Sequence, residues 1–104
     1  MIIVVEVWHL KPELSYQALR IMQEMDDMME PPAHRNPGWC GHAKFLQSST
    51  DPTRVLMIYP WRNRELHDKL AANEEPMLLP FYQEYCTRPR ELRYFTELPV
   101  EHED

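Results

Sequence analysis

The side chains best suited to chemistry are a tryptophan and a histidine that flank the junction of a predicted strand and a predicted helix. Residues 55–59 form a short apolar run with β-branched and aromatic members, which is typical of a buried strand. Asn63 has the side chain of a helix N-cap, so a helix should begin just after Trp61. Trp61 ends the strand, and His67 lies in the first turns of the helix. We therefore expect the functional site here, with Trp61 and His67 as its catalytic residues.

His67 could act as a general base. A neutral imidazole can take a proton from a phenol or an enol because its ordinary pKa lies near neutrality. The apolar pair Leu66 and Leu70 lies beside it on the helix, which favours an orientation toward the space between helix and sheet. The alternative is an exposed helix histidine. If His67 is the base, His67→Ala should lower turnover and leave folding nearly intact, because the ring would not belong to the core.

Met57 and Tyr59 share a strand face with Trp61, because successive side chains of a strand alternate between its two faces. This face is predicted to look into the same space as Val7 and His9 of the first strand. Aromatic walls with a few polar groups suit a flat polycyclic substrate, so these residues are predicted substrate contacts. Plain core packing is the alternative for the aromatic wall.

Two further predicted substrate contacts come from the helices. Met25 belongs to a group of methionines at helical spacing, whose flexible side chains could line an adaptable pocket, although they could equally fill the core. Tyr82 lies in the second helical region.

The elements that must position these side chains follow from the periodicity of the apolar residues. They are a strand over 2–10, a helix from residue 13 that stops by Pro31 and Pro32, a strand over 39–47, a strand over 55–59, a helix over 63–73, a separate short helical piece ending near Tyr85, and a strand over 91–97. This β-α-β-β-α-β order predicts an α+β protein with a ferredoxin-like antiparallel sheet and helices on one face. Residues 1–99 should form one domain, and residues 100–104 an acidic tail.

The other face of such a sheet needs a cover of its own. Val4, Trp8, Leu56 and Ile58 are assigned to it, and four apolar side chains left in water are unfavourable. A second copy of the chain is the simplest cover, so we expect a homodimer with sheets packed face to face.

The composition of the chain argues against a nucleic-acid-binding protein and against a membrane protein. The chain has 104 residues and a formal net charge of −6 with scattered charges, so no nucleic acid is expected as a partner. No apolar run approaches the ~20 residues of a membrane span, and no signal peptide is evident at the start. A cytoplasmic protein with two reduced cysteines is therefore expected. The five histidines and Cys40 show no metal-binding spacing, so no metal is predicted.

The sequence also resembles a known family. The pattern Pro37-Gly38-Trp39, then Ser48 and Asp51-Pro52 before an apolar strand, then Trp61-Arg62-Asn63-Arg64-Glu65-Leu66-His67, is similar to that of the antibiotic biosynthesis monooxygenases. The resemblance extends from Ile2 to Phe95. It implies a small dimeric α+β barrel. The family includes cofactor-free monooxygenases that oxidise anthrones or quinols to quinones, haem-degrading monooxygenases, and members with no established activity.

Within this resemblance, Trp61 matches the family's strand-end tryptophan, and His67 falls where quinone-forming members have a tyrosine. Met57 stands where those members tend to have an asparagine. Haem-degrading members differ more: Val7 replaces their first-strand asparagine and Leu70 their helix tryptophan, so haem degradation is not predicted.

The resemblance and the residues together predict a cofactor-independent monooxygenase, or a related tailoring enzyme, that acts on a phenolic or polycyclic aromatic substrate with dioxygen. The substrate anion would itself reduce dioxygen, so no cofactor is predicted. Two alternatives stay open. One is a non-catalytic dimeric binding or accessory protein of the same fold, which Met57 favours, and the other is a non-oxidative cyclase or isomerase.

Overall fold

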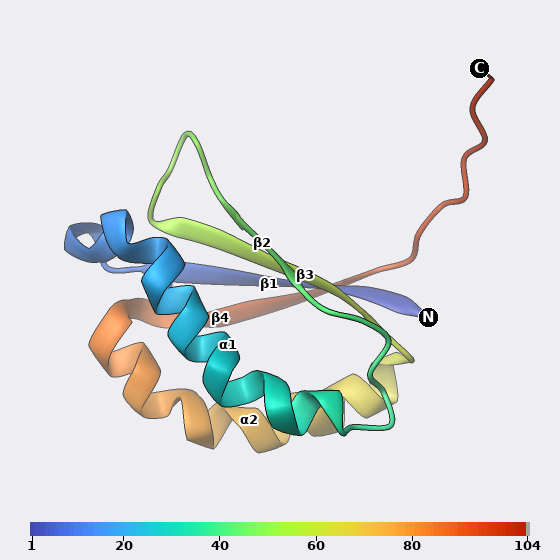
Figure 1. The fold of residues 1–104 in the computed structure, drawn as a ribbon, viewed down its shortest axis with the longest axis horizontal. Coiled ribbons are helices and arrows are strands. Elements are labelled where there is room, and N and C mark those ends of the chain that lie inside the picture. Colours follow the sequence, from blue (N-terminus) through green and yellow to red (C-terminus); the bar gives the residue numbers. More distant parts are fainter. Residues whose placement is uncertain (104) are drawn as a thin grey trace.

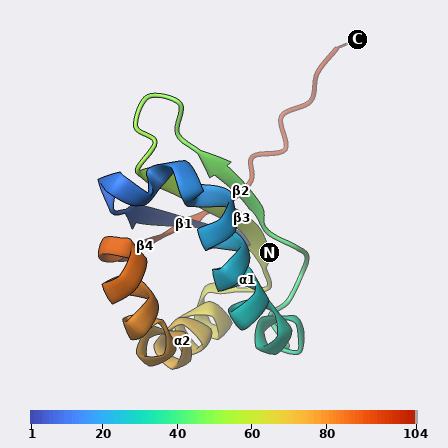
Figure 2. The same cartoon turned by 60° about the vertical axis from the view of Figure 1, so that its left-hand side comes forward.

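The computed structural model describes residues 1–103, and Asp104, the last residue of the predicted acidic tail, lies outside them. The elements are β1 (Ile2–Leu10), the 3-10 helix η1 (Pro12–Gln17), α1 (Ala18–His34), β2 (Lys44–Gln47), β3 (Arg54–Trp61), α2 (Arg64–Tyr85) and β4 (Cys86–Phe95). The strands form one antiparallel sheet in the order β2-β3-β1-β4. Figures 1 and 2 show both helices on the same face of this sheet. The predicted α+β, ferredoxin-like fold is confirmed.

The junction of β3 and α2 forms as its residues predict. The Asn63 side chain accepts a hydrogen bond of 2.8 Å from the backbone N–H of Leu66, which satisfies one of the free donors of the first helical turn. Glu65 lies in that turn, where a negative charge is favourable. This cap fixes the start of α2 immediately after the strand that carries Tyr59 and Trp61.

Both helices run further than predicted. α1 continues through Pro31 and Pro32 to His34, and α2 is a single helix through Pro76 and Pro80. A proline inside a helix removes a backbone donor and crowds the preceding turn. All four prolines are exposed, so the crowding can be relieved by bending toward the core. Figure 1 shows α2 curving in this way.

The second and last strands also differ from their predicted bounds. β2 is only Lys44–Gln47, and Trp39 joins the sheet through one isolated bridge to Trp61. β4 begins earlier, at Cys86, and contains Pro89. An edge strand tolerates a proline at a bulge, and Pro89 falls at the register shift between β1 and β4.

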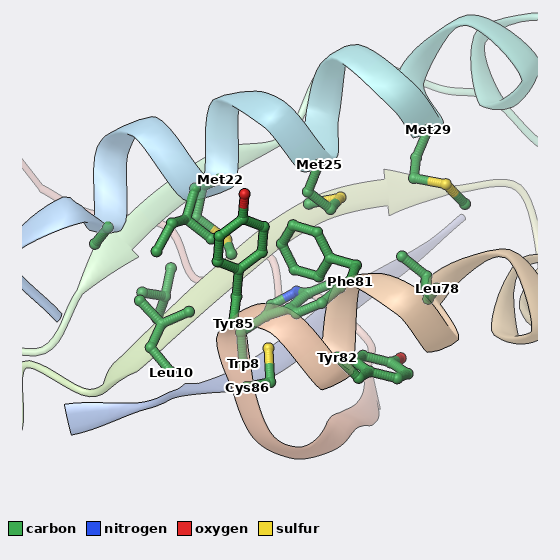
Figure 3. Close-up of a cluster of buried hydrophobic side chains, with 13 residues drawn as sticks. Trp8, Leu10, Met22, Met25, Met29, Leu78, Phe81, Tyr82, Tyr85 and Cys86 are labelled. Carbon is green, nitrogen blue, oxygen red and sulfur yellow. The ribbon is translucent and has the colours of Figure 1, made fainter. Parts of the chain in front are cut away.

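The core lies between the helices and one face of the sheet. Figure 3 shows Met22, Met25 and Met29 of α1 above Phe81 and neighbouring side chains of α2. Trp8 of β1 is fully buried in this cluster, and its ring meets that of Phe81 edge-on at 5.5 Å. Of the methionines predicted to be core filler or pocket lining, Met22, Met25 and Met29 therefore pack in the core, whereas Met28 is exposed.

The face of β1 that turns toward the helices was predicted wrongly. Val4 pairs with Tyr59 and is fully buried in the core, as is Trp8. Val7 pairs with Leu56, so Val7 and His9 lie on the opposite face from Tyr59 and Trp61. A strand has period two, so choosing the other face reverses every side chain at once.

The sheet face away from the helices keeps an apolar surface despite this correction. Leu56 and Ile58 lie on it as predicted and are half-buried, while Leu46 and Phe95 on the neighbouring strands are each 52% exposed. Within residues 1–103 neither helix covers this face.

Candidate functional site

A chain of hydrogen bonds crosses the interior from β1 to the start of α2. The Tyr59 hydroxyl donates to Glu6 Oε2 over 2.5 Å and lies 2.6 Å from His67 Nε2. His67 Nδ1 lies 2.8 Å from the Tyr94 hydroxyl of β4. Glu6 and His67 are almost completely buried. Strand pairing of β1 with β3 and β4, together with the Asn63 cap, brings these four side chains together.

Arg90 of β4 holds the carboxylates at the other end of this chain. Its guanidinium contacts Glu6 at 2.9 Å, Glu74 at 3.1 Å and Glu75 at 3.1 Å, each through a different nitrogen. The Trp8 indole N–H adds a further bond to Glu6 at 3.1 Å. A buried carboxylate is costly without such partners, so Arg90 is what permits Glu6 inside the core.

Burial shifts the pKa values of this cluster. It lowers the pKa of His67 to about 4, so the imidazole is neutral at pH 7. It raises the pKa of Glu74 to about 7, although Arg90 opposes the rise. The pKa of Tyr59 is raised well above its usual range by burial and by the Glu6 carboxylate, which keeps the phenol protonated. Shifted acids and bases that converge in this way are typical of functional sites.

These polar groups meet a pocket between the helices and the sheet. Glu6, Tyr59, Glu74 and Arg90 are the polar members of this cluster that line the pocket. The remaining lining comes mainly from α1, from β3 and from the loop before β2, and includes Met25, Met29, Trp39, Met57, Trp61 and Leu70. The space open to water-sized molecules is ≈ 40 Å³, enough for a few water molecules. A second cavity of ≈ 200 Å³ lies beside it along α1 and shares Asp26 with it.

Gly38 lets the loop before β2 approach Trp61. A Cβ atom at position 38 would lie 2.0 Å from the Trp61 Nε1 atom, far inside contact distance. Trp61 is buried, and within residues 1–103 its indole N–H has no hydrogen-bond partner. The Pro-Gly-Trp segment of the sequence therefore serves to close this loop against the pocket wall.

The structure brings together five of the eight predicted site residues. Trp61, Tyr59, Met57 and Met25 line the pocket. His67 turns inward, but it lies behind Tyr59 and does not line the pocket itself.

The other three predicted site residues lie elsewhere. Tyr82 packs against Trp8 and donates a hydrogen bond of 2.8 Å to Glu75, and it does not line the pocket. Val7 and His9 face away from the helices, and His9 lies near Glu91 and Arg88 instead.

Three charged residues of the site were not predicted from the sequence: Glu6, Glu74 and Arg90. One signal was available: Glu6 is the only formally charged residue in an otherwise apolar strand, and such a charge needs a partner if it is buried. Nothing in the local pattern points to Arg90, which follows 84 residues later.

Among residues 1–103, no three His, Cys, Asp or Glu side chains are grouped so that they could hold a metal ion. Neither helix of the described chain has the length and apolar character needed to cross a bilayer.

Comparison with solved structures shows which known proteins share this fold. No protein-family model and no curated protein matches the sequence. A solved antibiotic biosynthesis monooxygenase superposes with a TM-score of 0.65 at 20% identity, over 95% of this chain and 100% of that one. Rv0793 from Mycobacterium tuberculosis gives 0.62 at 20% identity, over 97% and 98% of the two chains.

A third solved structure carries a ligand. A monooxygenase from Streptomyces coelicolor, in complex with nanaomycin D, gives a TM-score of 0.67 at 13% identity, over 99% of this chain and 92% of that one. At sequence identities of 20% or less, structural similarity shows a shared fold and not a shared function. The chain thus has the fold of the antibiotic biosynthesis monooxygenases, as its sequence pattern predicted.

Proposed function

We propose that the protein is a cofactor-independent monooxygenase that oxidises a phenolic or polycyclic aromatic substrate to a quinone. The observation that carries the proposal is the pocket between helices and sheet, which is lined by Glu6 and Tyr59; His67 contacts Tyr59, and Arg90 contacts Glu6. Similarity of fold to monooxygenases, one of them with bound nanaomycin D, supports the same class of reaction.

In this proposal Glu6, Tyr59 and His67 act together as the base. The substrate O–H bond breaks, and its proton passes to the Glu6 carboxylate directly or through the Tyr59 hydroxyl. The resulting anion is oxidised by dioxygen, which is reduced and forms a bond to the substrate carbon. The O–O bond then breaks: one oxygen stays as the quinone carbonyl, and the other leaves as water with the proton from Glu6 and the hydrogen of the substrate carbon. The substrate supplies all the electrons.

The side chains that line the pocket determine which shape of substrate would fit. Trp61 and Trp39 offer flat aromatic surfaces, while Met25 and Met57 are flexible enough to move aside and open the pocket toward the neighbouring cavity. Asp26, Glu30 and other lining carboxylates make the site acidic. A neutral aromatic should therefore be preferred to haem with its two propionates.

A non-catalytic binding or accessory protein is the second candidate. The small open volume of the pocket, ≈ 40 Å³, favours it, because a polycyclic substrate enters only if the wall moves. Met57, where quinone-forming relatives tend to have an asparagine, also favours it.

Oxygen uptake separates these functions. Wild-type protein should consume dioxygen with members of a panel of anthrones and hydroquinones and release the corresponding quinones, while haem and flavin titrations should show no binding. Glu6→Gln, which keeps the size of the side chain and removes its charge, should abolish uptake. No uptake and no binding with any panel member would favour the accessory role, and turnover to a non-oxidised product would favour a cyclase or isomerase.

We also propose that the protein is a homodimer joined through the open sheet face. Ile58, Leu56, Leu46 and Phe95 provide its apolar surface. Ile58→Glu should shift a dimer to monomer in sedimentation experiments, because it buries an unpaired charge at the interface. An exposed apolar residue on a helix, Leu79, provides the matched control: Leu79→Glu should leave the dimer intact. A wild-type monomer at micromolar concentration would refute this assembly.

A further inference from the structure

We propose that Tyr94 is the port through which the buried acid–base site exchanges protons with solvent. The Tyr94 side chain is half-buried and lies at the outer end of the hydrogen-bonded chain. The other three members are enclosed: Glu6 is 1% exposed, Tyr59 6% and His67 0%. The role of this port in turnover depends on the proposed function, whereas proton exchange itself does not.

The hydrogen bonds of the chain have one consistent direction. Tyr59 donates its only proton to Glu6, so the 2.6 Å contact with His67 must be donated by His67 Nε2–H. A neutral imidazole carries one N–H, and its Nδ1 atom therefore accepts the 2.8 Å bond from the Tyr94 hydroxyl. Every donor thus points inward, from Tyr94 toward Glu6.

A chain of this kind moves protons without moving side chains far. Tyr94 takes a proton from water and gives its own to His67 Nδ1. The proton of Nε2 passes to the Tyr59 oxygen, and the Tyr59 proton passes to Glu6. The net result is one proton delivered to Glu6, with no change in oxidation. The reverse sequence carries a proton from Glu6 to the surface.

The pocket itself is the competing route for protons. Glu6 and Tyr59 line it, so water in the pocket can reach them when no ligand is bound. An aromatic substrate would expel this water, and the path through His67 and Tyr94 would then connect Glu6 to solvent. This arrangement lets the site stay dry during reaction without isolating its base.

Charged groups flank both ends of the chain. The Arg64 guanidinium lies 4.0 Å from the centre of the Tyr94 ring and bonds Asp68 at 3.0 Å, so both charges stand beside the port. At the inner end Arg90 faces Glu6. At the outer end Asp68 is a second acceptor beside the Tyr94 hydroxyl and competes with His67 Nδ1 for its proton.

The test measures proton exchange directly. Protein with ¹⁵N-labelled histidine should show His67 as the Nε2–H tautomer by NMR, and the exchange of this proton with water is then measured. Tyr94→Phe keeps the ring over Arg64 and removes only the hydroxyl, so exchange should slow about tenfold or more because the outer proton donor is lost. Tyr85→Phe, which removes a tyrosine hydroxyl at the other end of α2, should leave exchange unchanged.

Each result decides the proposal. Unchanged exchange in Tyr94→Phe, or an Nδ1–H tautomer of His67 in the wild type, would overturn it. Unchanged backbone spectra away from residue 94 would confirm that the variant keeps its fold. Since no substrate is needed, slow exchange in Tyr94→Phe would support the port even if oxygen uptake failed for every panel compound. If uptake is found, the rate of Tyr94→Phe should also fall and show a larger solvent isotope effect.

Discussion

Arg90→Met is expected to lower the free energy of unfolding by about 3–5 kcal/mol at pH 7. The guanidinium bonds Glu6, Glu74 and Glu75, and the first two of these carboxylates are buried. Methionine roughly preserves the volume of the side chain, so the loss would come from the uncompensated negative charges rather than from a cavity. Urea unfolding at several pH values is the appropriate measurement.

The control for this variant is Lys69→Met on α2, away from the open sheet face. Lys69 is exposed and contacts Glu65 at the surface, so the control should change stability by no more than about 0.5 kcal/mol. The sign of the pH effect gives a second check. Without Arg90, which opposes the effect of burial, the pKa of Glu74 in the folded state lies still further above that in the unfolded state, so stability is lost as the pH rises through the folded pKa. The deficit should therefore shrink toward pH 4, and a deficit independent of pH would contradict the charge argument.

The junction that carries the candidate site could be predicted because its signals are local. An N-cap at Asn63, an apolar run before it and the alternation of Met57, Tyr59 and Trp61 all lie within one short segment, and each specifies the same geometry. The inward orientation of His67 follows from the same register. This part of the fold could be predicted because the helix cap, the apolar run and the alternation of side chains along the strand all indicate the same structure.

β1 shows why the inward face of a strand could not be predicted from local signals. Both of its faces are apolar, with Val5 and Val7 on one and Val4 and Trp8 on the other. Val4 and Trp8 are predicted to lie on the outer face. Their face, which also carries Glu6, is in fact the inner one, where Arg90 neutralises Glu6 from a strand at the other end of the chain. A periodic pattern records which residues share a face, but not which distant partner permits a charge there.

The same reasoning explains the proline errors. A proline usually ends a helix, so the first helix is predicted to stop by Pro31 and Pro32 and the second helical region to divide near Pro76 and Pro80. Whether a helix breaks or only bends depends on the energy gained by packing its next turns. In α2 the turns after Pro76 bury Leu78, Phe81 and Tyr85, which favours continuing the helix. Local sequence signals do not contain this energy of tertiary packing.

His67 offers the second large effect, and the structure changes how it should be tested. Its ring is fully buried and joins Tyr59 to Tyr94, so the expectation that His67→Ala leaves folding nearly intact is wrong: alanine would open a cavity in the core. His67→Gln is the better variant, because an amide of similar length can hydrogen-bond to both tyrosines but cannot relay a proton. If uptake is found, turnover should fall by about 10²-fold in this variant.

The pH profile of kcat/KM then identifies the base. His67 must be neutral to accept a proton at Nδ1, and burial lowers its pKa to about 4. Activity of the wild type should therefore rise through about pH 4, and His67→Gln should lose this limb. Glu74 provides the internal comparison, since its pKa is raised to about 7 and its carboxylate also lines the pocket. A limb near pH 7 that survives in His67→Gln and disappears in Glu74→Gln would contradict the role of His67 and assign the base to Glu74.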